Sequence, residues 1–178
     1  MVIDINKPEE KLFKLLVPCR VVNTLFEINF AELRQRGMQG IVFDLDNTII
    51  PWSSPDICPE MLQWLKDLPA QDFRLCLVSN NGKERVKKIA FQCGVPFVAQ
   101  ARKPLRRGFR QAARVMGLSP DVVAVVGDQL FTDVLGGNRL GMFTIWVKPL
   151  TTQEFIGTKI TRQFEKLAVR LLKATGRL

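Results

Sequence analysis

Short apolar runs, each separated from the next by a stretch with helical character, constrain the fold of this chain more than any other feature. The runs are rich in valine, isoleucine and phenylalanine and cover residues 41–45, 75–79, 95–99, 122–126 and 142–147. Because they are apolar at consecutive positions, they indicate strands that are covered on both faces. The intervening stretches favour helices, and several end at glycine; they cover residues 59–68, 83–93, 104–116 and 131–140. This alternation predicts an α/β, Rossmann-like fold with a parallel sheet and helices on both faces.

The length of 178 residues fits one domain with short extensions at its ends. Residues 1–39 contain apolar positions at near-helical spacing and are expected to form an N-terminal helical extension. Residues 40–150 hold the alternation of strands and helices and are expected to form the core. In residues 151–178 the apolar side chains form one stripe at helical spacing, and most of the basic residues lie outside this stripe. This pattern predicts a basic amphipathic helix that packs on the core, and a helix lying in a membrane interface is the alternative.

The residue types that the chain lacks exclude several kinds of chemistry. Without any histidine, the chain cannot form a serine triad with a histidine base or a histidine-ligated zinc site. The four cysteines form no CxxC pair, so they are expected to be reduced thiols rather than zinc ligands or a redox dithiol. No apolar run approaches the ~18 residues of a membrane-spanning helix, and the first residues lack the pattern of a signal peptide. A cytoplasmic location is therefore expected.

Polar and charged residues follow four of the predicted strands. The four segments are Asp44-Leu-Asp46-Asn-Thr48, Ser79-Asn80-Asn81-Gly82, Arg102-Lys103-Pro104 and Gly127-Asp128-Gln-Leu-Phe-Thr132-Asp133. Ligands of such sheets bind at the carboxyl ends of the strands, so these segments are expected to form one site. Two carboxylates two residues apart repel each other unless a cation or a reaction uses them. The further acids of the last segment complete a set of oxygen ligands suited to magnesium.

Taken in order, these segments resemble the four motifs of the haloacid dehalogenase (HAD) phosphohydrolases. The DxDxT motif is matched by Asp44, Asp46 and Thr48, the second motif by Ser79, the third by Lys103, and GDxxxxD by Gly127, Asp128 and Asp133. The general resemblance covers about residues 40–148. The chain is more narrowly similar to the YqeG-type subfamily in the residues of its first two motifs, its short length and its N-terminal segment. That subfamily is similar to the mitochondrial phosphatidylglycerophosphate phosphatases. An aspartate-rich structural calcium site is the alternative, but it leaves the second and third motifs without a role.

The resemblance implies the chemical roles of two carboxylates. Asp44 would attack phosphorus and form an aspartyl phosphate. Asp46 would protonate the leaving oxygen and then deprotonate the attacking water, which is acid-base work that no histidine can do here. Asn47 stands where many members of the family carry glycine, and asparagine also accepts the backbone geometry of a tight turn.

The resemblance also implies how charge is balanced in the site. A Mg²⁺ ion would be held by Asp44, by the backbone carbonyl of Asp46 and by Asp128. Asp133 would lie near the metal or pair with Lys103. Phosphate-binding groups would be supplied by Thr48, Ser79, Asn80 and Lys103.

The spacing of the motifs leaves no room for an inserted cap domain. Thr48 and Ser79 are 31 positions apart, and Ser79 and Lys103 are 24 apart, which is enough each time for about one helix and one strand. The resemblance to uncapped relatives implies a bulky anionic phosphate as substrate. Residues 82–116 hold ten basic side chains against one acidic one and carry the whole net charge of +9, so they are expected to rim the mouth of the site and attract an anionic partner.

Together with these features, the resemblance implies a Mg²⁺-dependent phosphomonoester hydrolase that acts through an aspartyl phosphate. The leading substrate is a phosphatidylglycerophosphate-like lipid, with peripheral contact at the inner face of an anionic membrane. Nucleotides, nucleic-acid ends or phosphoproteins are alternative substrates, and a non-enzymatic anion-binding module is a further alternative. Nucleic acid is disfavoured because residues 82–116 contain only three aromatic side chains for base stacking.

Overall fold

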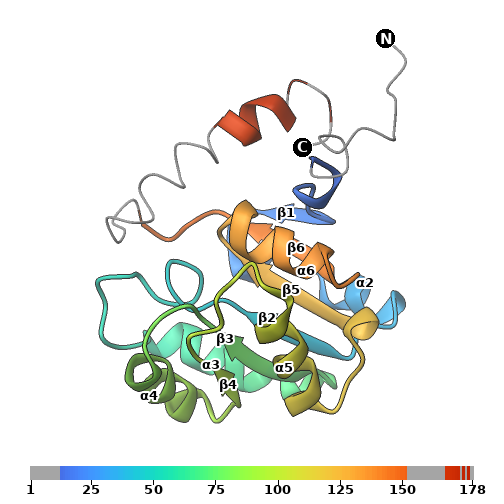
Figure 1. Cartoon of the computed structure of the whole chain (residues 1–178). Helices are drawn as coiled ribbons and strands as arrows, with labels where there is room; N and C mark the ends of the chain where they lie inside the picture. The colour runs from blue at the N-terminus through green and yellow to red at the C-terminus, as the bar shows by residue number, and fades with distance from the viewer. Residues whose placement is uncertain (1–12, 152–166, 173, 175, 177–178) are drawn as a thin grey trace.

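One parallel sheet forms the centre of the computed structural model, which describes residues 13–151, 167–172, 174 and 176 (Figure 1). The sheet has six strands in the order β1-β6-β5-β2-β3-β4. Every neighbouring pair is parallel. The strands are β1 (Arg20–Val22), β2 (Gly40–Phe43), β3 (Arg74–Val78), β4 (Phe97–Val98), β5 (Val123–Gly127) and β6 (Phe143–Val147).

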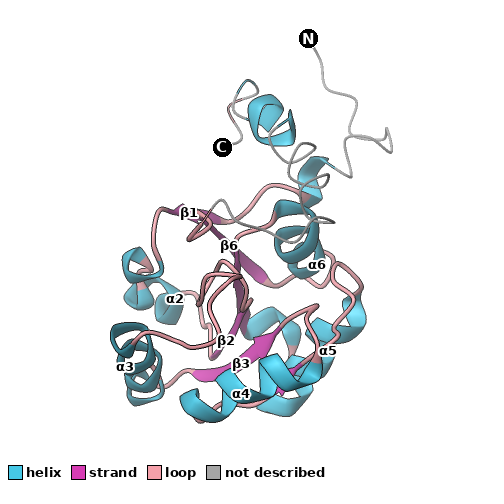
Figure 2. Ribbon diagram, turned by 90° about the vertical axis from the view of Figure 1, so that its left-hand side faces the viewer, coloured by secondary structure: helices cyan, strands magenta, loops and turns pink. Residues whose placement is uncertain are grey.

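Helices cover both faces of this sheet. They are α2 (Phe30–Gln35), α3 (Pro59–Asp67), α4 (Lys83–Cys93), α5 (Arg106–Met116) and α6 (Leu135–Asn138). Figure 2 shows α2 and α3 on one side of the sheet and α5 and α6 on the other. Shorter 3-10 turns lie at η1 (Leu25–Glu27), η2 (Pro69–Gln71) and η3 (Pro120–Val122), and a π-helical turn, η4 (Leu130–Val134), leads into α6. The expected α/β class, the parallel sheet and the absence of an inserted cap are confirmed over the described residues.

The core forms two apolar layers because successive side chains of a strand point to opposite faces. In β2, Ile41 and Phe43 join the layer that includes residues of α3 and α4. Val42, between them, joins the layer that includes Phe109 of α5. All four residues of β2 are buried, which explains why its sequence is continuously apolar.

The N-terminal segment contains a strand that the sequence analysis missed. Arg20–Val22 form β1, which pairs with β6 at the edge of the sheet, although residues 1–39 were expected to be helical. The run is three residues long and only partly buried, so it lacks the apolar signature of the central strands. Further along the segment, Leu25, Ile28 and Leu33 are buried in the core.

Two other elements are shorter than predicted. The run at 95–99 forms a strand only at Phe97–Val98, and the helix predicted over 131–140 is the turn η4 followed by the short α6. Much of the predicted C-terminal helix, residues 151–178, lies outside the described residues. Residues 167–172 are helical, and Leu172 is buried against the cluster that contains Leu16 and Leu130. No described helix is both long and apolar enough to cross a membrane.

Candidate active site

The sheet brings the four sequence motifs to one edge. Asp44 directly follows β2, Ser79 follows β3 and Asp128 follows β5. Because β2 lies between β3 and β5 and all three are parallel, their carboxyl ends are neighbours. Lys103 reaches the same edge from the loop between β4 and α5. The polar side chains that meet here are buried: Asp44, Thr48, Ser79, Lys103, Asp128 and Asp133.

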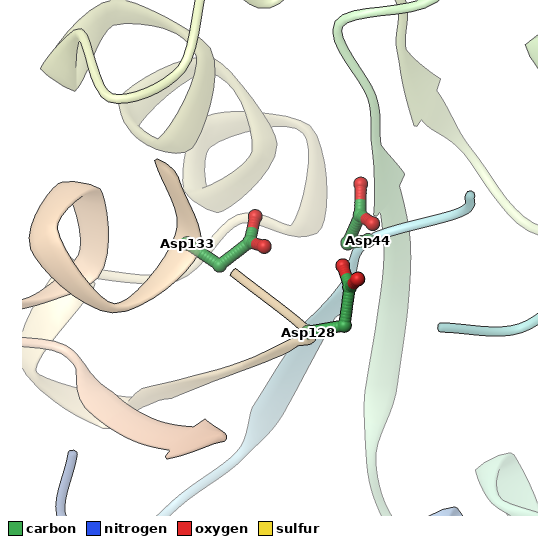
Figure 3. A group of neighbouring side chains, drawn as sticks. All are labelled: Asp44, Asp128 and Asp133. Atoms are coloured by element: carbon green, nitrogen blue, oxygen red, sulfur yellow. The ribbon is translucent and has the colours of Figure 1, made fainter. Parts of the chain in front are cut away.

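Three carboxylates form the floor of the site. Asp44 and Asp128 extend from neighbouring strand ends, and Asp133 points toward them from the turn η4 (Figure 3). One oxygen of each carboxylate lies within 4.8 Å of the corresponding oxygens of the other two. The cluster is therefore a compact group of hard oxygen donors, which is the donor type that Mg²⁺ prefers.

Lys103 neutralises part of this negative charge. Its Nζ donates to Asp44 Oδ1 and, at 2.7 Å, to Asp133 Oδ1. Burial by itself would lower the pKa of Lys103, but the Asp133 and Asp44 carboxylates outweigh burial and raise it above its ordinary value. Burial raises the pKa of the Asp44 carboxyl from 3.8 to about 7, opposed by Lys103 and reinforced by the charge of Asp133. Without a further cation, ionised Asp44 is therefore costly in this site.

Asp133 is held by donors on both carboxylate oxygens. Oδ1 accepts from Lys103, while Oδ2 accepts from the Gln129 backbone N–H and the Thr132 hydroxyl, both at 3.2 Å. Gly127 makes this position possible, since a Cβ at that residue would lie 2.3 Å from Asp133 Cγ. The sequence analysis left two roles open for Asp133, and this geometry makes it a partner of Lys103.

The turn after β2 places Thr48 over the cluster. The Thr48 hydroxyl lies 3.3 Å from Asp44 Oδ2 and 3.4 Å from Asp128 Oδ1. Asn47 adopts a left-handed conformation with a φ of 62°, which explains why glycine suits this position and why asparagine is accepted. Its side-chain oxygen accepts from the Trp52 backbone N–H at 3.1 Å, so Asn47 also holds the loop that follows.

Asp46 lies apart from the carboxylate floor, within its own set of donors. Its Oδ2 accepts from the Ser79 hydroxyl at 3.2 Å and from Asn81 Nδ2 at 3.3 Å. Its Oδ1 accepts from Arg85 Nε at 2.9 Å. The side chain of Asp46 is 18% exposed, so it can reach both the site and the solvent.

Arg85 is a residue of the site that sequence reasoning did not identify. It comes from the first turns of α4 and pairs with Asp46, while its other nitrogens donate to three carbonyls of the loop after β2: Ser54 (2.7 Å), Trp52 (2.9 Å) and Pro51 (3.3 Å). The sequence shows Arg85 only as one of the basic residues of 82–116. No local pattern could have distinguished it, since its partners lie 31 to 39 positions away.

Asn80 fixes the loop that carries Lys103. Its side-chain oxygen accepts from the Lys103 backbone N–H at 2.6 Å, and its Nδ2 donates to the Lys103 carbonyl at 3.3 Å. Its side chain is therefore occupied with the backbone of the third motif.

These groups surround an open cavity of about 410 Å³. Its lining includes Asp44, Asp46, Ser79, Asn80 and Lys103. Asn81, Gln129 and Thr132 also line it; they belong to the predicted segments but were given no role, whereas Trp52 lies outside those segments. The cavity therefore brings together most of the predicted site residues at a solvent-open mouth.

The basic residues of 82–116 divide into three groups. Lys103 is buried in the site, and Arg85 pairs with Asp46. Lys88 forms an exposed ion pair with Asp56 at 2.7 Å. The remaining basic side chains are exposed: Lys83, Lys87, Arg102, Arg106, Arg107, Arg110 and Arg114.

Comparisons with known proteins give one family match. Residues 10–150 match the family model described as mitochondrial PGP phosphatase. The chain is 38% identical over 167 residues to the probable phosphatase YqeG of Bacillus subtilis (strain 168), covering 94% of this chain and 97% of that protein. It is 30% identical over 166 residues to phosphatidylglycerophosphate phosphatase 1, chloroplastic, of Chlamydomonas reinhardtii, covering 87% of this chain and 61% of that longer protein.

A solved structure shares the fold. The deoxy-D-mannose-octulosonate 8-phosphate phosphatase YrbI of Haemophilus influenzae, in its cobalt-bound form, superposes with a TM-score of 0.52 at 13% identity. The match covers 79% of this chain and 91% of that one. At this identity the similarity concerns the fold.

Proposed function

Because the chain belongs to the mitochondrial PGP phosphatase family, we propose that it removes the terminal phosphate of a phosphatidylglycerophosphate-like lipid. The chain is a phosphomonoester hydrolase with the HAD fold. The observation that carries the finer proposal is the site itself: a buried cluster of Asp44, Asp128, Asp133 and Lys103 at the base of an uncapped cavity.

Asp44 is the proposed nucleophile. It lies at the end of the central strand β2 and lines the cavity, where a phosphate can approach it. In the first step a carboxylate oxygen of Asp44 forms a bond to phosphorus, and the bond from phosphorus to the lipid oxygen breaks. In the second step water attacks the aspartyl phosphate, which releases inorganic phosphate and restores the carboxylate.

Asp46 is the proposed acid and base for these two steps. It lines the same cavity as Asp44 but is held away from the carboxylate floor by Ser79, Asn81 and Arg85. In the first step it gives a proton to the departing lipid oxygen, and in the second it takes a proton from the attacking water. The separate donor sets of the two carboxylates suit two different roles.

The donor set also fits a divalent cation, which we propose to be Mg²⁺. Asp44, Asp128 and Asp133 are all buried oxygen donors, and the Lys103 ammonium contacts two of them, Asp44 and Asp133. Asp44, Asp128 and the backbone carbonyl of Asp46 would hold the ion, with Asp133 engaged by Lys103. When bound, the ion supplies positive charge that lets an anionic phosphate approach an ionised carboxylate.

Groups that carry the phosphoryl charge surround Asp44. The Lys103 ammonium lies beside the Asp44 carboxylate, and the Thr48 hydroxyl lies on its other oxygen. Ser79 and Asn80 line the cavity from the end of β3. We assign phosphate binding to these four residues because preorganised donors stabilise the charge that develops in the transition state. The backbone N–H of Asn80 is its proposed donor, since its side-chain amide is occupied with the Lys103 backbone.

The surface around the open mouth supports a lipid partner. Trp52 lines the cavity and is 38% exposed. Lys83, the first residue of α4, is exposed and directly follows Gly82, which lines the same cavity. A partly exposed aromatic side chain and a lysine at the mouth suit the interface of an anionic membrane. We therefore propose peripheral contact with such a membrane.

Phosphate release across substrate classes tests this function. Phosphatidylglycerophosphate in vesicles, a nucleotide monophosphate, a sugar phosphate and a phosphopeptide are compared with and without Mg²⁺. The expected result is Mg²⁺-dependent release, fastest with the lipid and abolished in Asp44→Asn. The matched control is Asp67→Asn, an exposed position on α3.

Two outcomes would contradict the proposal. Faster release from a nucleotide, sugar phosphate or phosphopeptide would overturn the lipid assignment while leaving the phosphatase intact. Near wild-type release by Asp44→Asn would overturn the assignment of the nucleophile.

A further inference from the structure

A second cavity, of about 750 Å³, lies beside the catalytic one. Asn80 lines both. The remaining lining of the second cavity comes from the end of β4, the loop after it and the first turns of α5, and it includes Gln100, Ala101, Arg102, Leu105, Arg107 and Gln111. None of the catalytic roles assigned above uses this cavity.

The wall between the two cavities is thin. It contains Asn80 and the backbone of Lys103, joined by the two hydrogen bonds of the Asn80 amide. Lys103 faces the catalytic cavity, whereas the preceding residue, Arg102, lines the second one. Consecutive Cα atoms are only about 3.8 Å apart across a trans peptide, so the two cavities lie on opposite sides of one stretch of backbone.

The position of the second cavity is fixed relative to the catalytic one. The backbone N–H groups of Gln100 and Ala101 donate to the carbonyls of Asn81 and Ser79, at 3.1 and 3.0 Å. On the other side, Gly108 brings α5 against this loop, because a Cβ there would lie 2.7 Å from the Ala101 Cβ. A ligand that spans both cavities therefore meets a preformed arrangement.

The charge of the second cavity is positive. Arg102 and Arg107 line it, and its lining contains no acidic residue. Within the described ranges, neither arginine side chain takes part in an ion pair, in contrast to Arg85 and Lys88. Two arginines with no carboxylate partner beside a catalytic site suit a second anionic group on the substrate.

We propose that this cavity binds the internal phosphodiester of the same substrate molecule whose terminal phosphate lies over Asp44. This inference rests on the proposed function, since a phosphatidylglycerophosphate carries a phosphodiester and a phosphomonoester joined by a glycerol bridge. The bridge passes over Asn80, and Arg102 and Arg107 bind the diester. Leu105, which is 53% exposed at the same cavity, offers an apolar surface to the glycerol and acyl part beyond it. The site thus selects phosphomonoesters that carry a second phosphate.

Two soluble substrates test this proposal without a membrane. Glycerophosphoglycerol phosphate has both phosphates, whereas glycerol 3-phosphate has the monoester alone. The wild-type protein is expected to prefer the first, measured as the ratio of the two kcat/KM values. In the double variant Arg102→Gln/Arg107→Gln this ratio is expected to fall about tenfold, which corresponds to ~1.4 kcal/mol, mainly through KM.

The matched control is Arg110→Gln/Arg114→Gln, which removes two exposed charges from α5 at positions that do not line the cavity. It is expected to keep the wild-type ratio. An equal loss of preference in the control would mean that general charge, rather than this cavity, attracts the substrate, and would overturn the proposal. The proposal would also be overturned if the double variant raised the inhibition constant of inorganic phosphate as much as the KM of glycerophosphoglycerol phosphate. Arg102 and Arg107 would then act on the phosphate at the catalytic site and not on a second phosphate.

The outcomes also separate this inference from the proposed function. A wild-type protein that hydrolyses both substrates with equal kcat/KM overturns the inference alone. A wild-type protein that releases phosphate from neither substrate nor from the lipid overturns the proposed function and this inference with it.

Discussion

Replacing Asp44 with asparagine is expected to stabilise the metal-free protein, and more strongly as the pH rises. Asp44 is 6% exposed, and burial raises the pKa of its carboxyl from 3.8 to about 7. This pKa is higher in the folded state than in the unfolded state. The folded protein therefore has its full stability below about pH 4, where Asp44 is protonated in both states, and it loses stability as the pH rises to about 7. Asparagine removes this titration but keeps the size of the side chain.

The size of the effect follows from the shift in pKa. One pKa unit corresponds to about 1.4 kcal/mol, so ionising Asp44 in the folded protein costs roughly 4 kcal/mol above pH 7. At pH 5 only about a third of this cost is present. The difference in the free energy of unfolding between Asp44→Asn and the wild type should therefore grow by roughly 3 kcal/mol between pH 5 and pH 8.

Urea unfolding in EDTA at pH 5, 6, 7 and 8, at constant ionic strength, measures this difference. Asp67→Asn, on the exposed surface of α3, is the control and should show little change with pH. Adding Mg²⁺ at pH 8 should stabilise the wild type more than Asp44→Asn, because the ion offsets the charge that asparagine lacks. A difference between Asp44→Asn and the wild type that stays constant from pH 5 to pH 8 would refute the reasoning.

Two further substitutions test how the site is positioned. Arg85→Gln removes the charged donor to Asp46 and the links to the loop carbonyls, so kcat for an alkyl phosphate should fall about tenfold to a hundredfold, with partial rescue by lysine. If Arg85 acts through Asp46, the double variant Arg85→Gln/Asp46→Asn should be little less active than Asp46→Asn alone. If Arg85→Gln lowers activity as much in the Asp46→Asn background as in the wild type, that role is refuted. Gly127→Ala places a Cβ 2.3 Å from Asp133 Cγ, so Asp133 must move away from Lys103. Activity should fall about a hundredfold, and wild-type kcat/KM in this variant would show that the position of Asp133 does not matter.

Much of the fold follows from local patterns in the sequence. The four inner strands β2, β3, β5 and β6 are mostly apolar and mostly buried, because both faces of the sheet are covered by helices. The edge strands were harder to predict for a physical reason. β1 is three residues long and partly exposed, and β4 has two residues, so neither buries enough surface to need a distinctive sequence.

Much of the candidate site was also predictable, because a parallel sheet brings the residues after its strands to one edge. Asp44, Ser79 and Asp128 were predicted from their positions at or near the ends of apolar runs, and the structure places them together. Lys103 was predicted from its motif, and the structure shows its contacts with Asp44 and Asp133. Their roles in catalysis stay predictions.

The sequence by itself determined the α/β class, the central strands and the set of polar residues at their ends, since each depends on the order of neighbouring residues. Only the tertiary structure decided which of the many basic side chains serve the site. Arg85 meets Asp46, Lys88 meets Asp56, and Arg102 and Arg107 line a second cavity. In the sequence these side chains have similar neighbouring residues, because the groups that they contact or line a cavity with lie on other elements. Packing of α4 and α5 against the sheet sets those distances, and no local pattern encodes them.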